Sequence, residues 1–564
     1  MPSDEPGTAM WRHIATTLAH AGCDLVTGVP SDEPALLDAA LAVPGLKAVP
    51  VRDQRAGACL AAGHALVSGN PAVLATNSGP SLPNALAGLL EAASLHAPVV
   101  VVTTRIPRAG LGRGGFQQVD QRAVSAAVAK WYVLAEDVDQ LDWALRQAVH
   151  RAINGAPGVV VVELAEEALQ GEPPRNAART APPRRLRSAP AGDDLDRAVD
   201  VMARATAPVI IAGGGAKAAG AGAPLRALAE TWGAAVFATA AGRGVLDEDH
   251  PRYCGLAGLY AAAPAAELLD DADVILALGT RLEETVRTGW SLAGQRLIHV
   301  DADPDAFDLA VRPEIALAGD AALTARLLAD GLTAHPSPTW SERIAAVKTE
   351  LPHTGSFAAS ALRAVRSRFG RDLVLVQENG LHDMWSYHYP LLSLSERAKV
   401  VAPGEQTMMG FGVAASLGAA LAEPSLPTVV ICGDGAMTMS MNALPVAAEQ
   451  GRGIVFVVFE NGGFGWPRYV RALAGSDIGI TRFAGGEPPY EAVIRALGGW
   501  STRCRTTGDL DAALEEAAKH AKNGALALVA VPVSDTDIPP GVLRAYGGAP
   551  ESPESLDKAD DHDA

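Results

Sequence analysis

Short apolar runs alternate with longer helical patterns along most of the chain. The runs are rich in β-branched and aliphatic residues and are bounded by turn-forming residues. The clearest are residues 24–29, 72–76, 98–103, 208–212, 273–278, 428–432, 454–459 and 525–531. Continuous apolar runs of this length are typical of strands that are buried on both faces, as in parallel sheets covered by helices. The pattern therefore predicts successive strand–helix units built on parallel sheets.

Two segments interrupt this pattern and divide the chain. Residues 171–192 are rich in Pro and Arg, and residues 334–355 contain HPSPTW and PHTG, so both are predicted to be linkers that cross the surface. At about 100–200 residues per domain, a chain of 564 residues has room for about three domains. We therefore predict three consecutive parallel-sheet α/β domains, at residues 1–170, 190–333 and 356–548, and a disordered acidic tail at residues 549–564.

Charge and composition narrow the class of protein. The chain has 46 basic and 64 acidic side chains and a formal net charge of −18, which argues against nucleic acid or an anionic membrane as a partner. No apolar run approaches the roughly 20 residues that span a bilayer, and no basic and apolar leader opens the chain. The five scattered cysteines lack CxxC spacing, so neither a disulfide framework nor a zinc site is expected. We expect a cytoplasmic protein.

The sequence TVVICGDG at residues 428–435 is the strongest local signal for chemistry. Asp434 follows the end of a predicted strand, and a helical stretch and a second strand lead to Asn461. One such crossover often returns to a neighbouring position in the sheet, so Asp434 and Asn461 can lie side by side. With a loop carbonyl such as that of Gly463, they form a hard-oxygen site that suits Mg²⁺. The alternative is a helix-capping Asp, with Asn461 in an ordinary turn.

The spacing of these residues resembles the signature of the thiamine diphosphate enzyme superfamily. Its GDG motif is followed after about 25–30 residues by Asn, and here residues 436–460, 25 in all, separate GDG from Asn461. The resemblance implies that Asp434, Asn461 and the Gly463 carbonyl bind the Mg²⁺ that holds the cofactor diphosphate. Many members have Asn-Asn where this chain has Glu460-Asn461, and the second Asn is the one that matches the metal ligand.

Further motifs resemble the acetolactate synthase-like branch. GLHDMW at residues 380–385 is similar to its GQHQMW, whose His reaches the diphosphate. TMMGFG at residues 407–412 is similar to its GTMGFG, whose Met props the cofactor in a bent conformation. Residues 28–30, 77–84 and 115–117 are similar to first-domain loops of the family. The resemblance implies cofactor contacts at Pro30, Gln54, Pro80, Asn84, Gly380, His382, Met409, Gly433, Gly435, Ala436 and Met437.

The resemblance also implies which part of the cofactor each domain binds. In this family the first domain binds the aminopyrimidine and the third binds the diphosphate, and the two come from different subunits, so a homodimer or homotetramer is expected. The middle domain is mainly structural, although some relatives place FAD there. AGGGAK at residues 212–217 lacks a full GxGxxG with a properly placed acid, so FAD is less favoured than thiamine diphosphate with Mg²⁺.

Gln54 is the most informative departure from the family. The segment at residues 52–69 is similar to the family's RHEQAAAHMADGYARVTG, and the register places Gln54 where Glu belongs. An amide has no proton to share, so the tautomer shift that activates the cofactor loses its acid, a kind of help typically worth about 10²–10⁴-fold. Three interpretations stay open: slower but sufficient activation, replacement of the acid by Asp53, or cofactor binding without useful catalysis.

The resemblance implies decarboxylation of a 2-oxo acid and transfer of the acyl-anion equivalent to a carbonyl acceptor, as in acetolactate synthesis. Simple decarboxylation, or a non-catalytic cofactor-binding paralogue, is the alternative. Phe116 and Gln117 join Gln54 as candidate catalytic residues. Arg468 either pairs with a substrate carboxylate or is a solvated helix residue.

The substrate itself is not carried over from the resemblance. Trp466 follows the metal Asn and is a further candidate to face the substrate. Glu405 and Gln406 stand where the acetolactate branch has small or apolar residues. The substrate pocket is therefore expected to differ from that of the branch.

Overall fold

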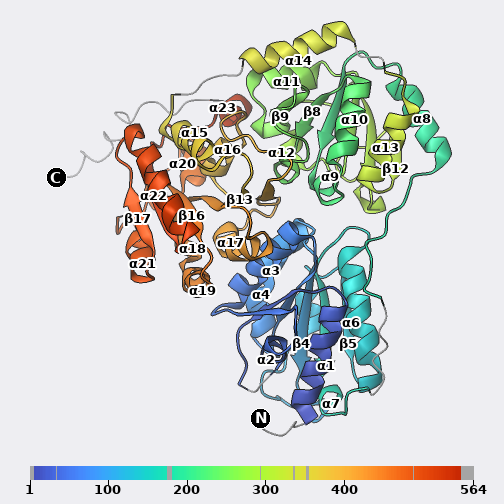
Figure 1. The fold of residues 1–564 in the computed structure, drawn as a ribbon, viewed down its shortest axis with the longest axis vertical. Coiled ribbons are helices and arrows are strands. Elements are labelled where there is room, and N and C mark those ends of the chain that lie inside the picture. Colours follow the sequence, from blue (N-terminus) through green and yellow to red (C-terminus); the bar gives the residue numbers. More distant parts are fainter. Residues whose placement is uncertain are drawn as a thin grey trace.

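The computed structural model describes residues 6–32, 35–174, 181–292, 294–334, 337–350, 355–486 and 488–547. Figure 1 shows three α/β units, coloured blue to cyan, green to yellow, and orange to red along the chain. Each unit holds a six-stranded sheet in which neighbouring strands run parallel. The predicted fold class is confirmed, and each predicted apolar run coincides with a strand to within two residues. The predicted acidic tail lies outside the described residues.

The first unit has the strand order β2-β1-β3-β4-β6-β5. Its strands are β1 (Leu25–Gly28), β2 (Lys47–Pro50), β3 (Ala72–Ala75), β4 (Val99–Arg105), β5 (Trp131–Ala135) and β6 (Val160–Ala165). Helices α3 (Gln54–Ser68) and α4 (Ser81–Ser94) cover one face, and α1 (Pro6–His20) and α6 (Val138–Ile153) cover the other. The central strands are buried on both faces, which is why their sequences are apolar throughout.

The second unit has the strand order β12-β11-β10-β7-β8-β9. Its strands are β7 (Pro208–Ala212), β8 (Ala235–Ala238), β9 (Tyr253–Leu256), β10 (Val274–Leu278), β11 (Arg296–Asp301) and β12 (Ile315–Ala318). Its main helices are α8 (Gly192–Met202), α10 (Gly222–Trp232), α11 (Ala263–Asp270) and α13 (Ala321–Gly331). Its core forms a cluster of its own, to which the third unit contributes Tyr389.

The two predicted linkers differ in the structure. Residues 181–191 form neither helix nor strand and run over the surface, as predicted. Residues 334–355, in contrast, contain helix α14 (Pro338–Glu350). Trp340 of this helix is buried in the core of the second unit and donates a hydrogen bond to the Pro208 carbonyl over 3.0 Å. Helix α14 therefore packs on the core of the second unit, although it lies past residue 333 in the chain.

The third unit repeats the topology of the first, with the strand order β14-β13-β15-β16-β18-β17. Its strands are β13 (Val374–Gln377), β14 (Lys399–Val401), β15 (Thr428–Gly433), β16 (Ile454–Glu460), β17 (Trp500–Arg503) and β18 (Ala527–Pro532). Helices α15 (Phe357–Phe369) and α22 (Leu510–Lys522) cover one face and α17 (Phe411–Ala422) covers the other. The strand order reverses between β13 and β15, and in open parallel sheets such a switch point is where ligands bind.

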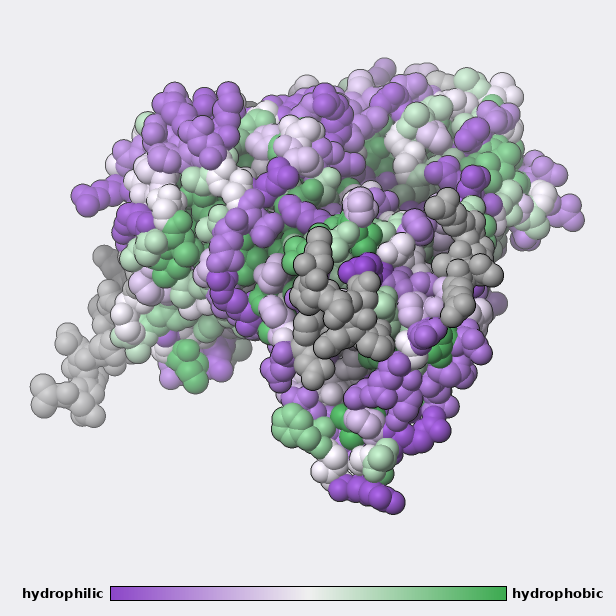
Figure 2. Space-filling model, turned by 60° about the horizontal axis from the view of Figure 1, so that its bottom comes forward, coloured by the Kyte–Doolittle hydropathy of each residue, from purple (hydrophilic) through white to green (hydrophobic). Residues whose placement is uncertain are grey.

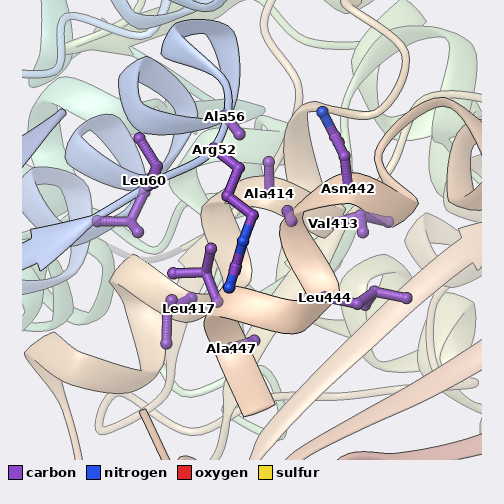
Figure 3. Close-up of a pocket in the computed structure, with 12 residues that line it drawn as sticks. Arg52, Ala56, Leu60, Val413, Ala414, Leu417, Asn442, Leu444 and Ala447 are labelled. Atoms are coloured by element: carbon purple, nitrogen blue, oxygen red, sulfur yellow. The ribbon is translucent and has the colours of Figure 1, made fainter. Parts of the chain in front are cut away.

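Helices α3 and α17 join the first and third units through one continuous core. The two helices approach so closely that a Cβ at Gly63 would lie 2.3 Å from the Ala415 carbonyl oxygen, and one at Gly418 would lie 2.0 Å from that of Leu60. Figure 3 shows Leu60 of α3 and Val413, Ala414 and Leu417 of α17 around a small pocket at this contact. Only glycine permits this approach, so the pairing of the two units depends on these positions.

The face of the molecule drawn in Figure 2 is mainly polar, and the cysteines carry free thiols. The face of the molecule drawn in Figure 2 carries mainly hydrophilic side chains, with apolar ones in smaller groups between them. Among the helices of the described ranges, none combines the length and the apolar character that a bilayer crossing requires. All five cysteines are described, and each is a buried free thiol.

Candidate active site

A cleft lies at the carboxyl ends of β13, β15 and β16, beside the switch point of the third sheet. Its empty volume is about 770 Å³, counted out to its open mouth. The segments that follow these three strands and β18 form its walls, together with Ala358 of α15 and Met409, which precedes α17. The predicted residues that line it are Gly380, His382, Met409, Gly433, Asp434, Gly435, Ala436, Asn461 and Gly463. The structure thus brings together most of the residues predicted for the third domain.

Asp434 lies at the start of helix α18 (Asp434–Met439), directly after β15. Its Oδ2 accepts hydrogen bonds from the backbone N–H groups of Asn461 (3.1 Å), Gly462 (2.8 Å) and Gly463 (3.3 Å), while Oδ1 accepts one from Gly435 (2.8 Å). Burial raises the pKa of this carboxyl, and the four N–H donors act in the opposite direction. The neighbouring strands β15 and β16 bring Asp434 and Asn461 together, as the sequence predicts.

Two buried polar atoms face this cleft without a partner. Within the described part of the chain, no group hydrogen-bonds Asn461 Oδ1 or His382 Nε2. A buried amide oxygen or imidazole nitrogen normally has a partner, because losing water without replacement is costly. Burial also lowers the pKa of His382 to about 3, so its ring is neutral. An acceptor beside a carboxylate suits a divalent cation, and a neutral ring can donate to an anion.

Gly435 packs closely against two other residues that line the cleft. A Cβ at this position would lie 3.0 Å from the Phe464 ring and 3.4 Å from Met409 Cε. Met409 and Phe464 therefore both lie beside Gly435, and all three residues line the cleft. A flexible thioether and an aromatic ring are suited to hold a flat, ring-bearing group between them.

Arg468 has a role that differs from both predicted ones. The residue is 3% exposed, and its guanidinium pairs with Asp535 and donates to the Asn461 carbonyl over 3.0 Å. It therefore neither faces the cleft as a substrate anchor nor lies in solvent: it supports the loop that carries Asn461. The predicted Trp466 does line the cleft.

Glu460, which replaces the first Asn of the family motif, turns away from the cleft. Its carboxylate accepts from Arg503 over 2.9 Å and from Tyr490, inside the third unit. Met437 also lies away from the cleft, fully buried in the core that the first and third units share.

The predicted residues of the first domain do not line the cleft of their own chain. They are Pro30, Gln54, Pro80, Asn84, Phe116 and Gln117. Gln54 opens α3, and its Nε2 donates to Ser81 Oγ over 3.3 Å. Phe116 is 85% exposed at the tip of a loop, and the next residue, Gln117, has a φ of +60°.

Asp53 caps the N-terminus of helix α3. It is the N-cap of α3, where Oδ1 accepts from the Arg55 and Ala56 N–H groups. Its Oδ2 accepts from Asn442 Nδ2 over 2.8 Å. These contacts hold the carboxylate, so Asp53 is not positioned to replace the missing family Glu.

Sequence reasoning missed Glu378, which directly follows β13. This residue is fully buried, and its two oxygens accept from the Val413 N–H (2.7 Å) and the Gly410 N–H (3.0 Å) at the start of α17. Burial raises the pKa of Glu378 to about 7. Its place between the short apolar run at residues 373–376 and the GLHDMW motif was the available signal.

The glycines of residues 212–217 are explained by close packing within the second unit. A Cβ at Gly213 would lie 2.3 Å from the Gly279 carbonyl oxygen, and one at Gly215 would lie 2.9 Å from the same atom. The loops after β7 and β10 therefore touch backbone to backbone. Lys217 donates to the Gly244 and Ala398 carbonyls and ties this loop to the third unit.

The fold and the cleft define a class of protein: an α/β protein with a switch-point site suited to an anionic cofactor held through a divalent cation. Comparison with protein families gives three matches along the chain. They are the N-terminal TPP binding domain of thiamine pyrophosphate enzymes over residues 10–124, the central domain over 195–328 and the C-terminal TPP binding domain over 378–531. The chain belongs to the thiamine pyrophosphate (thiamine diphosphate) enzymes.

Individual relatives carry two kinds of activity in their names. An acetolactate synthase from Mycobacterium bovis is 27% identical over 523 residues, which cover 88% of this chain and 84% of that protein. A probable 2-ketoarginine decarboxylase from Pseudomonas aeruginosa is 29% identical over 496 residues, covering 86% of this chain and 87% of that protein.

A solved structure shares the fold. The Rhodococcus jostii thiamine diphosphate-dependent 4-hydroxybenzoylformate decarboxylase superposes with a TM-score of 0.79 and 23% identity. The match covers 93% of this chain and 99% of that chain. The arrangement of three parallel-sheet units is thus a known one.

Proposed function

We propose that this protein is a Mg²⁺- and thiamine diphosphate-dependent enzyme that decarboxylates a 2-oxo acid and transfers the acyl fragment to a carbonyl acceptor. One observation carries the proposal: Asp434 and Asn461 meet at the carboxyl ends of β15 and β16, beside the switch point, and Asn461 Oδ1 is buried there with no partner in the described ranges. The names of the relatives support both carboligation and simple decarboxylation, in which a proton takes the place of the acceptor.

The residues of the cleft divide the work of holding the cofactor. Asp434, Asn461 and the Gly463 carbonyl would hold Mg²⁺, and His382 and the N–H groups at the start of α18 would hold the diphosphate. Met409 and Phe464 would fix the rings. When bound, thiamine diphosphate supplies a carbon nucleophile and accepts the electrons that decarboxylation releases.

A second copy of the chain would complete the site. The cleft is lined by the third unit alone, and an apolar ring such as Phe116 at 85% exposure is a contact that a partner can bury. We infer that the partner supplies its own Gln54, Phe116 and Gln117, together with the Pro30, Pro80 and Asn84 loops, in a homodimer or a dimer of dimers. Free buried cysteines support a reducing setting such as the cytoplasm.

Gln54 supports a second candidate function, a cofactor-binding protein without useful catalysis. Its amide donates to Ser81 Oγ and carries no acidic proton, and Asp53 is held as a helix cap. The two interpretations that remain are slow but sufficient activation and binding without turnover.

One experiment separates these functions. CO₂ release is measured for a panel of 2-oxo acids with thiamine diphosphate and Mg²⁺, with and without aldehyde or 2-oxo acid acceptors, and Asp434→Asn serves as the inactive control. Carboligation predicts CO₂ together with a 2-hydroxy ketone product, and simple decarboxylation predicts CO₂ and an aldehyde. Saturable cofactor binding with no CO₂ from any acid would contradict the enzymatic proposal and support the second candidate.

A further inference from the structure

Glu91 is a fully buried carboxylate where the three units meet. It lies near the end of α4 in the first unit, and it is 0% exposed. Its Oε1 accepts from the Gly404 N–H over 2.6 Å, and its Oε2 accepts from the Met408 N–H over 2.9 Å. Both donors belong to the loop at residues 402–410 of the third unit, which leads into α17. Both oxygens of Glu91 thus accept hydrogen bonds from backbone N–H groups of the third unit.

The loop that Glu91 holds contains a strained residue. Thr407 has a φ of +48°, which is unusual for a β-branched side chain and is tolerated only when surrounding contacts enforce it. Thr407 lies between the two N–H groups that Glu91 accepts, and its own N–H donates to the Gly404 carbonyl over 3.0 Å. Glu91 therefore stabilises a turn that the local sequence does not favour.

The second unit holds the same loop from another side. Glu405 Oε1 accepts from Thr285 Oγ1 over 2.6 Å. At the end of α4, Arg281 of the second unit donates to the Ser94 carbonyl over 2.7 Å. A Cβ at Gly404 would lie 2.6 Å from Ser94 Oγ, so the loop and α4 are in direct contact. The loop is fixed from both neighbouring units.

The end of the loop carries Met409, which lines the cleft. Met409 follows Met408 directly, and its Cε would be 3.4 Å from a Cβ at Gly435. A shift of the Met408 backbone therefore moves the Met409 side chain within the cleft. The other end of α4 carries Ser81, which accepts from Gln54. One helix thus contacts both the residue at the missing-acid position and the loop of Met409.

We propose that Glu91 is a positioning residue: its carboxylate, by binding the Gly404 and Met408 N–H groups, fixes where Met409 stands beside the cofactor rings. The proposal rests on the proposed function, because it takes thiamine diphosphate as the ligand of the cleft. A carboxylate suits this task, since charge-assisted hydrogen bonds are short and about twice as strong as neutral ones. A neutral amide at this position offers one acceptor oxygen for two donors.

The test uses Glu91→Gln, which keeps the size of the side chain and replaces one acceptor by a donor. Glu163→Gln is the matched control, because Glu163 is a buried carboxylate of the same unit that binds Gln121 and Tyr132 and does not touch the loop. Affinities of the full-length protein for thiamine diphosphate and for inorganic pyrophosphate, each with Mg²⁺, are measured from tryptophan fluorescence, since Trp466 lines the cleft.

We expect Glu91→Gln to weaken thiamine diphosphate binding by roughly tenfold or more, as a misplaced positioning group does, and to leave pyrophosphate binding unchanged, because Met409 faces the rings. Amide hydrogen exchange of residues 402–410 should become faster in the same variant. Glu163→Gln should change neither ligand's affinity nor this exchange.

Three outcomes would overturn the proposal. Equal weakening of both ligands would make Glu91 a general structural residue. Unchanged affinity for thiamine diphosphate would separate Glu91 from the cofactor rings. Unchanged exchange at residues 402–410 would show that the carboxylate does not fix the loop. Failure of the proposed function is distinguishable. A wild type that binds neither ligand would remove the cofactor from the account, and a wild type that binds thiamine diphosphate without releasing CO₂ would remove only the catalytic activity. In both cases the exchange measurement would still decide whether Glu91 fixes the loop.

Discussion

The buried carboxyl of Glu378 predicts that the stability of the third unit depends on pH in an unusual direction. Folding buries this group completely and raises its pKa from 4.5 to about 7, although two N–H groups of α17 bind it. A pKa raised by folding means that the native state favours the protonated form. The stabilisation is therefore complete below about pH 4.5 and is lost as the pH rises through about 7.

The size of the effect follows from the shift. A difference of about 2.5 between 4.5 and about 7, at 1.36 kcal/mol for each pKa unit, corresponds to about 3 kcal/mol. For a unit of roughly 150–250 residues, about 2–4 °C per kcal/mol gives a change of about 6–12 °C in melting temperature. Glu378→Gln removes the titrating group and keeps its shape.

The assay is a set of melting curves between pH 4.5 and 8.5 for wild type, Glu378→Gln and the control Glu516→Gln, whose carboxylate is exposed on α22. The melting temperature of wild type relative to Glu378→Gln should fall by about 6–12 °C as the pH rises across this range. The control should follow wild type. Parallel curves for wild type and Glu378→Gln would refute the reasoning.

Three further changes test the site. Gln54→Glu should raise the hydrogen–deuterium exchange rate at the thiazolium carbon of bound cofactor by about 10²-fold or more, and an unchanged rate would show that residue 54 does not act on the pyrimidine. Gly435→Val should weaken thiamine diphosphate binding in calorimetry by roughly tenfold or more through overpacking against Phe464 and Met409. Unaltered affinity would contradict the assignment of this cleft as the cofactor site. Arg468→Met should lower the melting temperature, because breaking a buried ion pair costs about 3–5 kcal/mol. The same variant should need a higher Mg²⁺ concentration for cofactor binding. A Mg²⁺ requirement equal to that of wild type would show that Arg468 does not support the metal loop.

Much of the fold could be predicted from the sequence because parallel sheets leave a simple trace. Strands buried on both faces are apolar throughout, and β7, β10, β15 and β16 were recognisable on that basis alone. Helix α14 was missed because the prolines around it indicate a linker, whereas Trp340 finds its partners in a core built from distant residues. Local turn signals do not report such long-range burial.

The residues of the site could also be predicted only in part from the sequence. Asp434 and Asn461 were predictable because the ends of neighbouring parallel strands meet at one edge of the sheet. Arg468 was misjudged because nothing near it in sequence shows that Asp535 and the Asn461 carbonyl would enclose it. Glu91 and Glu378 were not found because each acts on a backbone segment far along the chain, 313 and 32 residues away at the nearest contact.

The central claim is that Asp434 and Asn461 hold the divalent ion that anchors the cofactor. Calorimetric titration of the purified full-length protein with thiamine diphosphate, in Mg²⁺ and then in excess EDTA, tests it most directly when Asp434→Asn and Asn461→Ala are measured beside wild type. The account predicts one cofactor bound per chain in Mg²⁺, no binding in EDTA and severe loss of binding in both variants. Equal affinity with and without Mg²⁺, or wild-type affinity in either variant, would contradict it.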